Sequence, residues 1–210
     1  MYVLSLQPPS TSTIDWTGFD FFGTLGITDL WTQYHPLTFR QYHQQLVQSE
    51  HRFSNAQVKT LWSSSAHPAA RTVLYRALSK CIPHKSYLCK LGSVQNSLCS
   101  FCAQGIDTLR HFLVDCPVKW QFWQSVLSHY YANYPLTVEL IYGTVRYLHL
   151  PRFIQDHSRY IAVISTTLWQ MWNLYWLHGR QNPAPLSSAS IPHFLSRTVC
   201  HIDKLLPSHT

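Results

Sequence analysis

The feature that most constrains this fold is a cluster of cysteines with one histidine near the middle of the chain. Residues 99–116 read CSFCAQGIDTLRHFLVDC, which gives the spacing Cys99-x2-Cys102-x8-His111-x4-Cys116. Two cysteines separated by two residues suit a tight turn that presents both thiolates to one metal ion. A chain that binds metal here must fold around the cluster.

The second pair of ligands depends on where a helix ends. Asp107 or Thr108 can cap the helix that carries His111. Residues five apart in an ideal α-helix point about 140° away from each other, so His111 and Cys116 can share a metal only if the helix distorts or ends between them. Pro117 disfavours the helical conformation for the residue before it. We therefore expect the chain to leave the helix at Cys116.

Three thiolates and one imidazole form a closed tetrahedral set that is typical of structural zinc. A catalytic zinc keeps one position open for water, usually with a carboxylate nearby as base. Asp115 is adjacent in sequence, but nothing marks it as a base, and we expect it to face solvent. The sequence predicts one structural zinc ion, with the ligands Cys99, Cys102, His111 and Cys116.

Other interpretations of the cysteines stay open at this point. Three buried free thiols beside a core histidine would need no metal, and Cys81 or Cys89 can replace one of the four ligands. A redox pair is disfavoured because no βαβ pattern accompanies the two closely spaced cysteines. The opening MYVLSLQPPS carries no secretory signal. We therefore expect an intracellular protein, in the nucleus or cytoplasm, where disulfides are rare.

Apolar spacing predicts a mainly α fold, a small helical domain built around one CCHC zinc knot with an irregular N-terminal segment. Helical patterns cover residues 36–48, 54–62, 67–80, 83–92, 117–131 and 160–179, with a further short helix around 194–206. The uncharged run 160–177 is long enough to raise the question of a membrane span. Its polar residues and its apolar stripe favour a buried helix of a soluble protein, ending at Gly179.

Three regions are expected along the chain. Residues 1–50 form an irregular segment with one short helix, residues 51–131 form the zinc-binding domain, and residues 132–210 form a helical extension. The net charge is +7, and residues 50–120 hold nine basic against three acidic residues. A positive field of this kind favours polyanionic partners, although a solvated basic surface without a partner is the alternative.

Candidate contacts to nucleic acid follow from this charge. The residues expected to contact phosphates are Arg71, Arg76, Lys80, Lys85 and Lys90. Tyr87 or Phe101 can stack on bases. The alternatives are that Phe101 packs under the zinc and that Tyr87 belongs to the core.

Residues 58–123 resemble the zinc-binding domain at the C-terminal end of the reverse transcriptases of non-LTR retrotransposons. The matching positions are Trp62, the helix around 71–78, Cys99, Cys102, Thr108, the His-Phe-Leu of 111–113, Cys116, Pro117 and Trp123. Asp107 stands where the family usually has Glu. The later LWQMWNLYW (168–176) is similar to a tryptophan-containing helix that often follows this domain.

The resemblance implies a nucleic-acid-binding accessory module with structural zinc and without a polymerase or nuclease active site. The family's polymerase needs paired aspartates for two metal ions, and this chain has neither an Asp-Asp pair nor a Pro-Asp motif. We therefore expect that this chain is not an enzyme. The expected partners are RNA or DNA, bound with low sequence specificity, and a reverse transcriptase polymerase domain, with no membrane. The alternative is a structural or protein-interaction module, a remnant of a decayed element, that binds no nucleic acid of its own.

Overall fold

The computed structural model describes residues 53–181 and 191–206, with side chains described through residue 177 in the first range. Within these ranges the chain is helical and has no strand, apart from an antiparallel bridge between Leu98 and Ile106. The helices are α4 (Asn55–Ser63), α5 (Pro68–Leu78), α6 (Lys85–Lys90), the π-helix η1 (His111–Asp115), α7 (Pro117–Tyr131), α8 (Val138–Tyr147), α9 (His157–Gln181) and α10 (Ile191–Leu205). The mainly helical fold is confirmed. The helix expected at 36–48 and the irregular segment expected at 1–50 lie outside the described residues.

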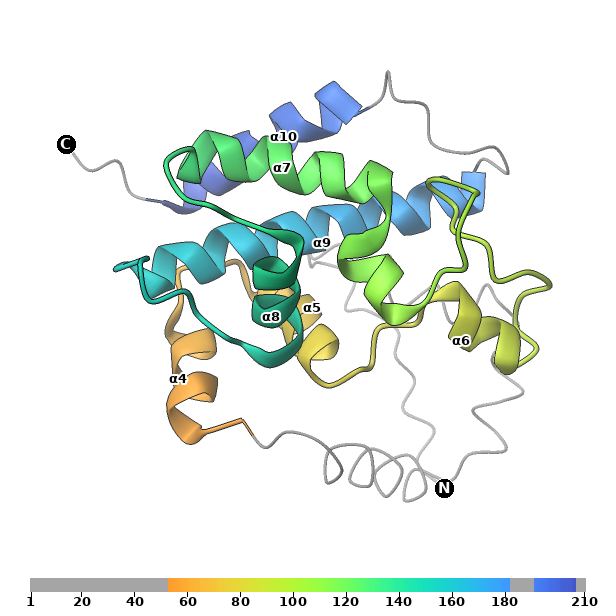
Figure 1. Cartoon of the computed structure of the whole chain (residues 1–210), viewed down its shortest axis with the longest axis horizontal. Helices are drawn as coiled ribbons and strands as arrows, with labels where there is room; N and C mark the ends of the chain where they lie inside the picture. Colours follow the sequence, from red (N-terminus) through yellow and green to blue (C-terminus); the bar gives the residue numbers. More distant parts are fainter. Residues whose placement is uncertain (1–52, 182–190, 207–210) are drawn as a thin grey trace, which may run out of the picture.

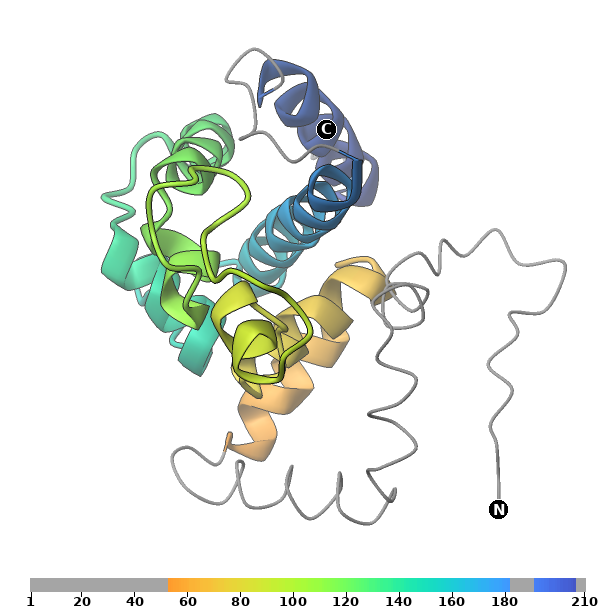
Figure 2. The ribbon, with the colours of Figure 1, turned by 90° about the vertical axis from the view of Figure 1, so that its right-hand side faces the viewer.

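The longest helix, α9, lies between the other helices of the described chain (Figures 1 and 2). α5 packs against one side of it, and α7 and α10 pack against the other. Every residue from 160 to 168 is buried. The buried hydroxyls of Ser165 and Thr167 donate to the carbonyls of Ala162 and Val163, at 3.4 and 2.7 Å. The helix can therefore bury polar side chains without leaving these donors unpaired.

The bounds of α9 differ from the expected 160–179. The helix begins at His157, because the Asp156 carboxylate accepts a hydrogen bond from the backbone N–H of Arg159 at 2.9 Å. It continues to Gln181, so Gly179 does not end it. No helix in the described part of the chain is both long enough and apolar enough to cross a membrane.

Most of the expected helices begin at the residues that the sequence indicates. Ser54 caps α4 through a capping box with Gln57. In α5, Pro68 occupies the first turn and the His67 ring accepts a hydrogen bond from the N–H of Ala69 at 3.2 Å. Pro117 likewise opens α7. These starts use the local chemistry of single residues, which is why the sequence predicts them well.

Two helices depart from the sequence expectation. α6 is shorter than the expected 83–92, because His84 rather than Pro83 caps it. α8 was not expected, although Thr137 caps it through a hydrogen bond from the N–H of Leu140 at 3.3 Å. The buried Ile141 and Val145 of α8 supply a helical stripe that the sequence does contain.

One hydrophobic core runs through the described residues and includes side chains from both sides of residue 131. Trp123 and Val126 contribute to it from α7, while Ile164 and Ile202 contribute from α9 and α10. The division into domains at residue 131 stays a prediction. The helices that pack around the candidate metal centre therefore come from both before and after residue 131.

Candidate metal centre

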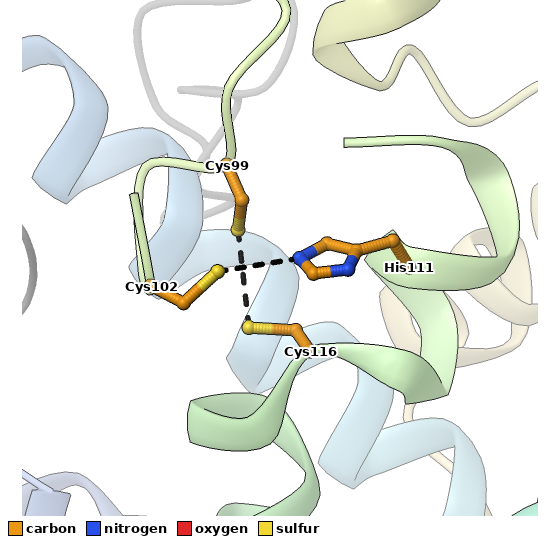
Figure 3. A group of neighbouring side chains, drawn as sticks. All are labelled: Cys99, Cys102, His111 and Cys116. Carbon is orange, nitrogen blue, oxygen red and sulfur yellow. Dashed lines mark hydrogen bonds between the residues drawn. The ribbon is translucent and has the colours of Figure 1, made fainter. Parts of the chain in front are cut away.

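Three sulfur atoms and one ring nitrogen converge at one point of the described chain. The ligand atoms of Cys99, Cys102, His111 and Cys116 all lie within 4.8 Å of one another, and their side chains point toward each other (Figure 3). Cys99 Sγ lies 3.9 Å from Cys116 Sγ, and Cys102 Sγ lies 3.4 Å from His111 Nε2. A tetrahedral zinc ion with ordinary bond lengths requires separations of about 3.8 Å between sulfurs and about 3.6 Å between sulfur and nitrogen. The donor set therefore fits zinc.

The alternative ligands Cys81 and Cys89 lie outside this group. The Cys81 sulfur instead contacts the carbonyl oxygen of Ser79 at 3.2 Å. The interpretation in which either cysteine replaces one of the four ligands is therefore wrong.

The first two ligands are positioned by a tight hairpin. The N–H of Cys99 donates to the carbonyl of Gly105 at 2.9 Å, and the N–H of Ala103 donates back to the carbonyl of Cys99 at 2.9 Å. Ala103 adopts a positive φ of 54°, which completes the turn. The N–H of Phe101 lies 3.4 Å from Cys99 Sγ and donates to it. The hairpin thus fixes the backbone and also stabilises a thiolate at Cys99.

The other two ligands are brought together by the π-helix. The N–H of Cys116 donates to the carbonyl of His111 at 3.2 Å, a bond that spans five residues. Cys116 itself is extended, with φ −68° and ψ 122°, as expected before Pro117. The expected distortion of the helix is confirmed. Thr108 caps this segment by accepting a hydrogen bond from the N–H of His111 at 3.2 Å.

Gly105 leaves space for the histidine ligand. A Cβ atom at this position would lie 2.8 Å from Cε1 and 3.2 Å from Nδ1 of His111. Such contacts are too close for an unmoved ring, so only glycine permits the observed orientation of the imidazole. Gly105 was not predicted from the sequence, because its role depends on where the His111 ring lies in the fold.

A buried ion pair lies beside the cluster. Lys119 Nζ is 3.6 Å from Asp107 Oδ1, and the two side chains are 1% and 0% exposed. Asp107 Oδ2 accepts hydrogen bonds from the Lys85 N–H at 2.9 Å and from the Tyr175 hydroxyl. Asp107 therefore does not cap the helix, and the capping alternative that names it is wrong. Its carboxylate ties α6, α7 and α9 to the metal-binding segment.

Aromatic rings surround the ammonium group of Lys119. Its Nζ lies 4.0, 4.5 and 5.3 Å from the ring centroids of Phe112, Tyr175 and Phe101. The faces of such rings attract a cation, and the attraction is stronger where the cation is buried, as Lys119 is. Lys119 was not among the residues predicted from the sequence, although it lies in phase with Phe122 and the rest of the buried face of α7. This helical phase was the signal in the sequence that could have indicated the burial of Lys119.

The side chains of the cluster shift the pKa values of one another. The hydrogen bond with Cys116 is the largest cause that lowers the pKa of Cys99, and the charge of Lys119 contributes. The same hydrogen bond raises the pKa of Cys116. Hydrogen bonding to Cys99 raises the pKa of His111. Burial is the main cause that raises the pKa of Tyr175, which remains a hydrogen-bond donor to Asp107.

Asp115 faces solvent, as expected. Its carboxylate pairs with Arg110, at 3.1 Å from Nε, and both side chains are at least 40% exposed. Arg110 also pairs with Glu139 of α8. Asp115 is therefore part of a surface ion-pair network beside the cluster.

The expected phosphate contacts lie on or between two helices. Arg71, Arg76 and Lys80 belong to α5 or follow it, and Lys85 and Lys90 begin and end α6. Lys90 is exposed and the other four are half-buried. Burial lowers the pKa of Arg76.

The two aromatic candidates differ in exposure. Tyr87 is 37% exposed, whereas Phe101 is only 2% exposed and contacts the Tyr175 ring at 5.6 Å. Phe101 therefore packs beneath the cluster, and the interpretation that it stacks on bases is wrong.

Comparison with known families decides what this region is. Residues 38–123 match the family described as zinc-binding in reverse transcriptase. This segment, less than half of the chain, is therefore similar to a reverse transcriptase zinc-binding domain. The resemblance stated from the sequence is confirmed, and the zinc-binding domain contains all four candidate ligands. No curated protein and no solved structure matched the chain.

Proposed function

We propose that the chain is a nucleic-acid-binding accessory module whose fold is stabilised by one structural zinc ion. The observation that carries the proposal is the convergence of four donor atoms within 4.8 Å, in a segment that matches a zinc-binding domain. Cys99, Cys102, His111 and Cys116 would fill all four positions of a tetrahedral ion. The ion would cross-link the hairpin to the start of α7, and catalysis is not part of the proposal.

Charge supports nucleic acid as the partner. Residues 53–106 contain no Asp or Glu, and they hold six basic residues, Lys59, Arg71, Arg76, Lys80, Lys85 and Lys90. Contacts from Lys and Arg to phosphates bind without reading sequence. They weaken as the salt concentration rises, because counterions released from the nucleic acid into a more concentrated salt solution contribute less free energy. We therefore propose binding of RNA or DNA with low sequence specificity.

Zinc stoichiometry tests the metal half of the proposal. We expect one zinc per purified chain, and we expect Cys99→Ser and His111→Ala to lose it. Cys200→Ser is the matched control, because Cys200 is exposed and lies outside the cluster. A metal-free wild type that is as stable as the zinc-treated protein would show that the cluster is not a structural site.

A salt titration tests the nucleic-acid half. Binding of labelled DNA and RNA should weaken steeply between low and physiological salt, and Lys90→Gln should reduce the slope. Lys204→Gln, at an exposed lysine of α10, is the control. Absence of binding at low salt, or binding that ignores salt, contradicts this half without affecting the zinc measurement.

One observation favours the alternative of a protein-interaction module. Tyr134 and Phe153 are each 41% exposed, and their rings stack with centroids 5.4 Å apart. They lie in the connections before and after α8, outside the matched segment. If this pair docks a polymerase domain, Phe153→Ser should abolish co-purification with that domain and leave zinc content unchanged.

A further inference from the structure

Two large aromatic rings are exposed side by side on the zinc-binding domain. Trp62 in α4 and Tyr75 in α5 are 44% and 41% exposed. Their ring centroids are 6.0 Å apart and the planes are tilted by 42°. Trp and Tyr contribute large apolar areas when they are buried, so two neighbouring rings at the surface are available to a ligand.

Basic side chains accompany these rings. The Arg71 guanidinium donates to the carbonyl oxygen of Trp62, and its carbon lies 5.8 Å from the centroid of the Trp62 ring. Arg71 precedes Tyr75 by four residues, so the two side chains share one face of α5. Lys59 is exposed and lies three residues before Trp62 on α4. Lys59, Trp62, Arg71 and Tyr75 together are called the α4–α5 surface.

The charge around this surface identifies the class of ligand. α4, α5 and α6 contain no acidic residue, so no carboxylate of these helices neutralises Lys59 or Arg71. Polyanions are attracted to such a region. Exposed aromatic rings stack on nucleobases whatever the sequence, while neighbouring cations follow the phosphates. In a duplex the bases are already stacked on each other, so only an unpaired strand offers its base faces.

We propose that the α4–α5 surface binds single-stranded nucleic acid, with bases stacked on Trp62 and Tyr75. Lys59 and Arg71 lie beside the rings, where they contact the phosphates. The inference rests on the proposed nucleic-acid binding and adds to it a strand preference and a stacking site. The stacking of bases on the two rings can be distinguished from binding to the basic side chains. Stacking contributes to the affinity without the salt dependence of phosphate contacts.

The test uses the full zinc-loaded chain and fluorescence anisotropy. The probes are a labelled oligothymidylate and a labelled oligouridylate of about 15 nucleotides, and a duplex of equal length. We expect Trp62→Leu and Tyr75→Leu each to weaken single-strand binding about 5-fold or more. Duplex binding should change less than about 2-fold, because the phosphate contacts remain. Tyr75→Trp should retain the affinity for single strands.

Tyr134→Leu is the matched control, because Tyr134 has the same 41% exposure as Tyr75 but lies outside the matched segment. It should leave single-strand binding unchanged. Zinc content and melting temperature are measured for every variant. If Trp62→Leu fails to fold, the comparison of Tyr75→Leu with Tyr75→Trp decides the question.

The outcomes separate this inference from the proposed function. If wild type binds nucleic acid with the expected salt dependence, and both leucine variants bind single strands as tightly as wild type, the stacking site is wrong and the proposed function stands. Equal losses for single strands and duplex also overturn the stacking site. Wild type that binds no nucleic acid at low salt overturns both the stacking site and the proposed nucleic-acid binding, whether or not it binds an acidic peptide.

Discussion

At the scale of single residues, the candidate metal centre depends on side chains other than its four candidate ligands. Gly105 makes room for His111, while Lys119 and Asp107 place a buried ion pair beside the thiolates. Partners that surround ligands in this way hold them in position and tune their ionisation. The four ligands are therefore only part of the site.

Gly105→Ala is expected to weaken zinc binding. The added methyl group would meet the His111 ring at 2.8 Å, so the imidazole must turn away from the sulfurs. Loss of such positioning typically costs about 10- to 100-fold in metal affinity. Competition with a chromophoric chelator measures the change. Gly143→Ala is the control, because its Cβ would meet only ordinary contacts at 3.7 Å. Equal affinities for wild type and Gly105→Ala would contradict this role.

Lys119→Met is expected to lower the free energy of unfolding by about 3 kcal/mol or more. The substitution leaves the Asp107 carboxylate buried without its cation, and breaking a buried pair costs about 3–5 kcal/mol. Denaturant titration of the zinc-loaded protein measures the change. The double variant with Asp107→Asn should recover part of the loss. Lys90→Met, at an exposed lysine, should stay within about 0.5 kcal/mol of wild type.

At the scale of elements, the π-helix joins the two halves of the site. Its extra residue per turn closes the five-residue gap between His111 and Cys116, and the extended Cys116 leads directly into α7. α8 packs against this π-helix, and the exposed Arg110 bridges the two through Asp115 and Glu139. The bridge lies on the surface, so its contribution should be small.

Arg110→Ala is accordingly expected to cost less than about 1 kcal/mol. Its guanidinium also lies 4.7 Å from the Tyr142 ring centroid, so part of the cost comes from lost packing rather than charge. Thermal unfolding at low and high salt separates the two parts, because salt screens only the ion pairs. A loss of several kcal/mol would mean that the network holds the π-helix in place.

The elements also explain how far sequence could predict this site. Spacing and Pro117 were enough to predict which four side chains lie together and where the helix breaks, at Cys116, because both depend on local chemistry. The phase of α7 indicates that Lys119 faces the core, but its partners could not be predicted, because Tyr175 is 68 residues from Asp107. The exposure of Trp62 likewise depends on which helices leave it uncovered. Features of this kind depend on contacts between segments that are far apart in the sequence, and a single sequence does not show which segments meet.

At the scale of the whole molecule, metal binding should be linked to protons. Hydrogen bonding with Cys99 raises the pKa values of both His111 and Cys116, so both groups carry protons in mildly acidic solution. Zinc must displace these protons, and its affinity should fall as pH falls. We expect weaker binding and greater proton release at about pH 6 than at about pH 8. Calorimetry in buffers of different ionisation enthalpy measures both, and a pH-independent affinity would contradict the assigned ligands.

The segment that matches the family, residues 38–123, should be shorter than the part of the chain that folds as one unit. A fragment of residues 53–131 keeps all four ligands and all of α7, but it lacks α9. We expect it to be insoluble or to lack cooperative unfolding, because it exposes the core that α9 covers. Residues 53–206 should unfold cooperatively with zinc bound. A soluble, cooperatively folded 53–131 fragment would show that the metal suffices.

The hydroxyl of Tyr175 shows what this difference means for evolution and for engineering. It reaches the carboxylate of Asp107 from a helix that begins 34 residues after the matched segment ends at residue 123. A zinc-binding domain transplanted at the edges of its sequence motif would therefore carry its ligands without the helix that closes their environment. In this chain, a unit that keeps this hydrogen bond must extend at least to Tyr175, well beyond the last cysteine of the cluster.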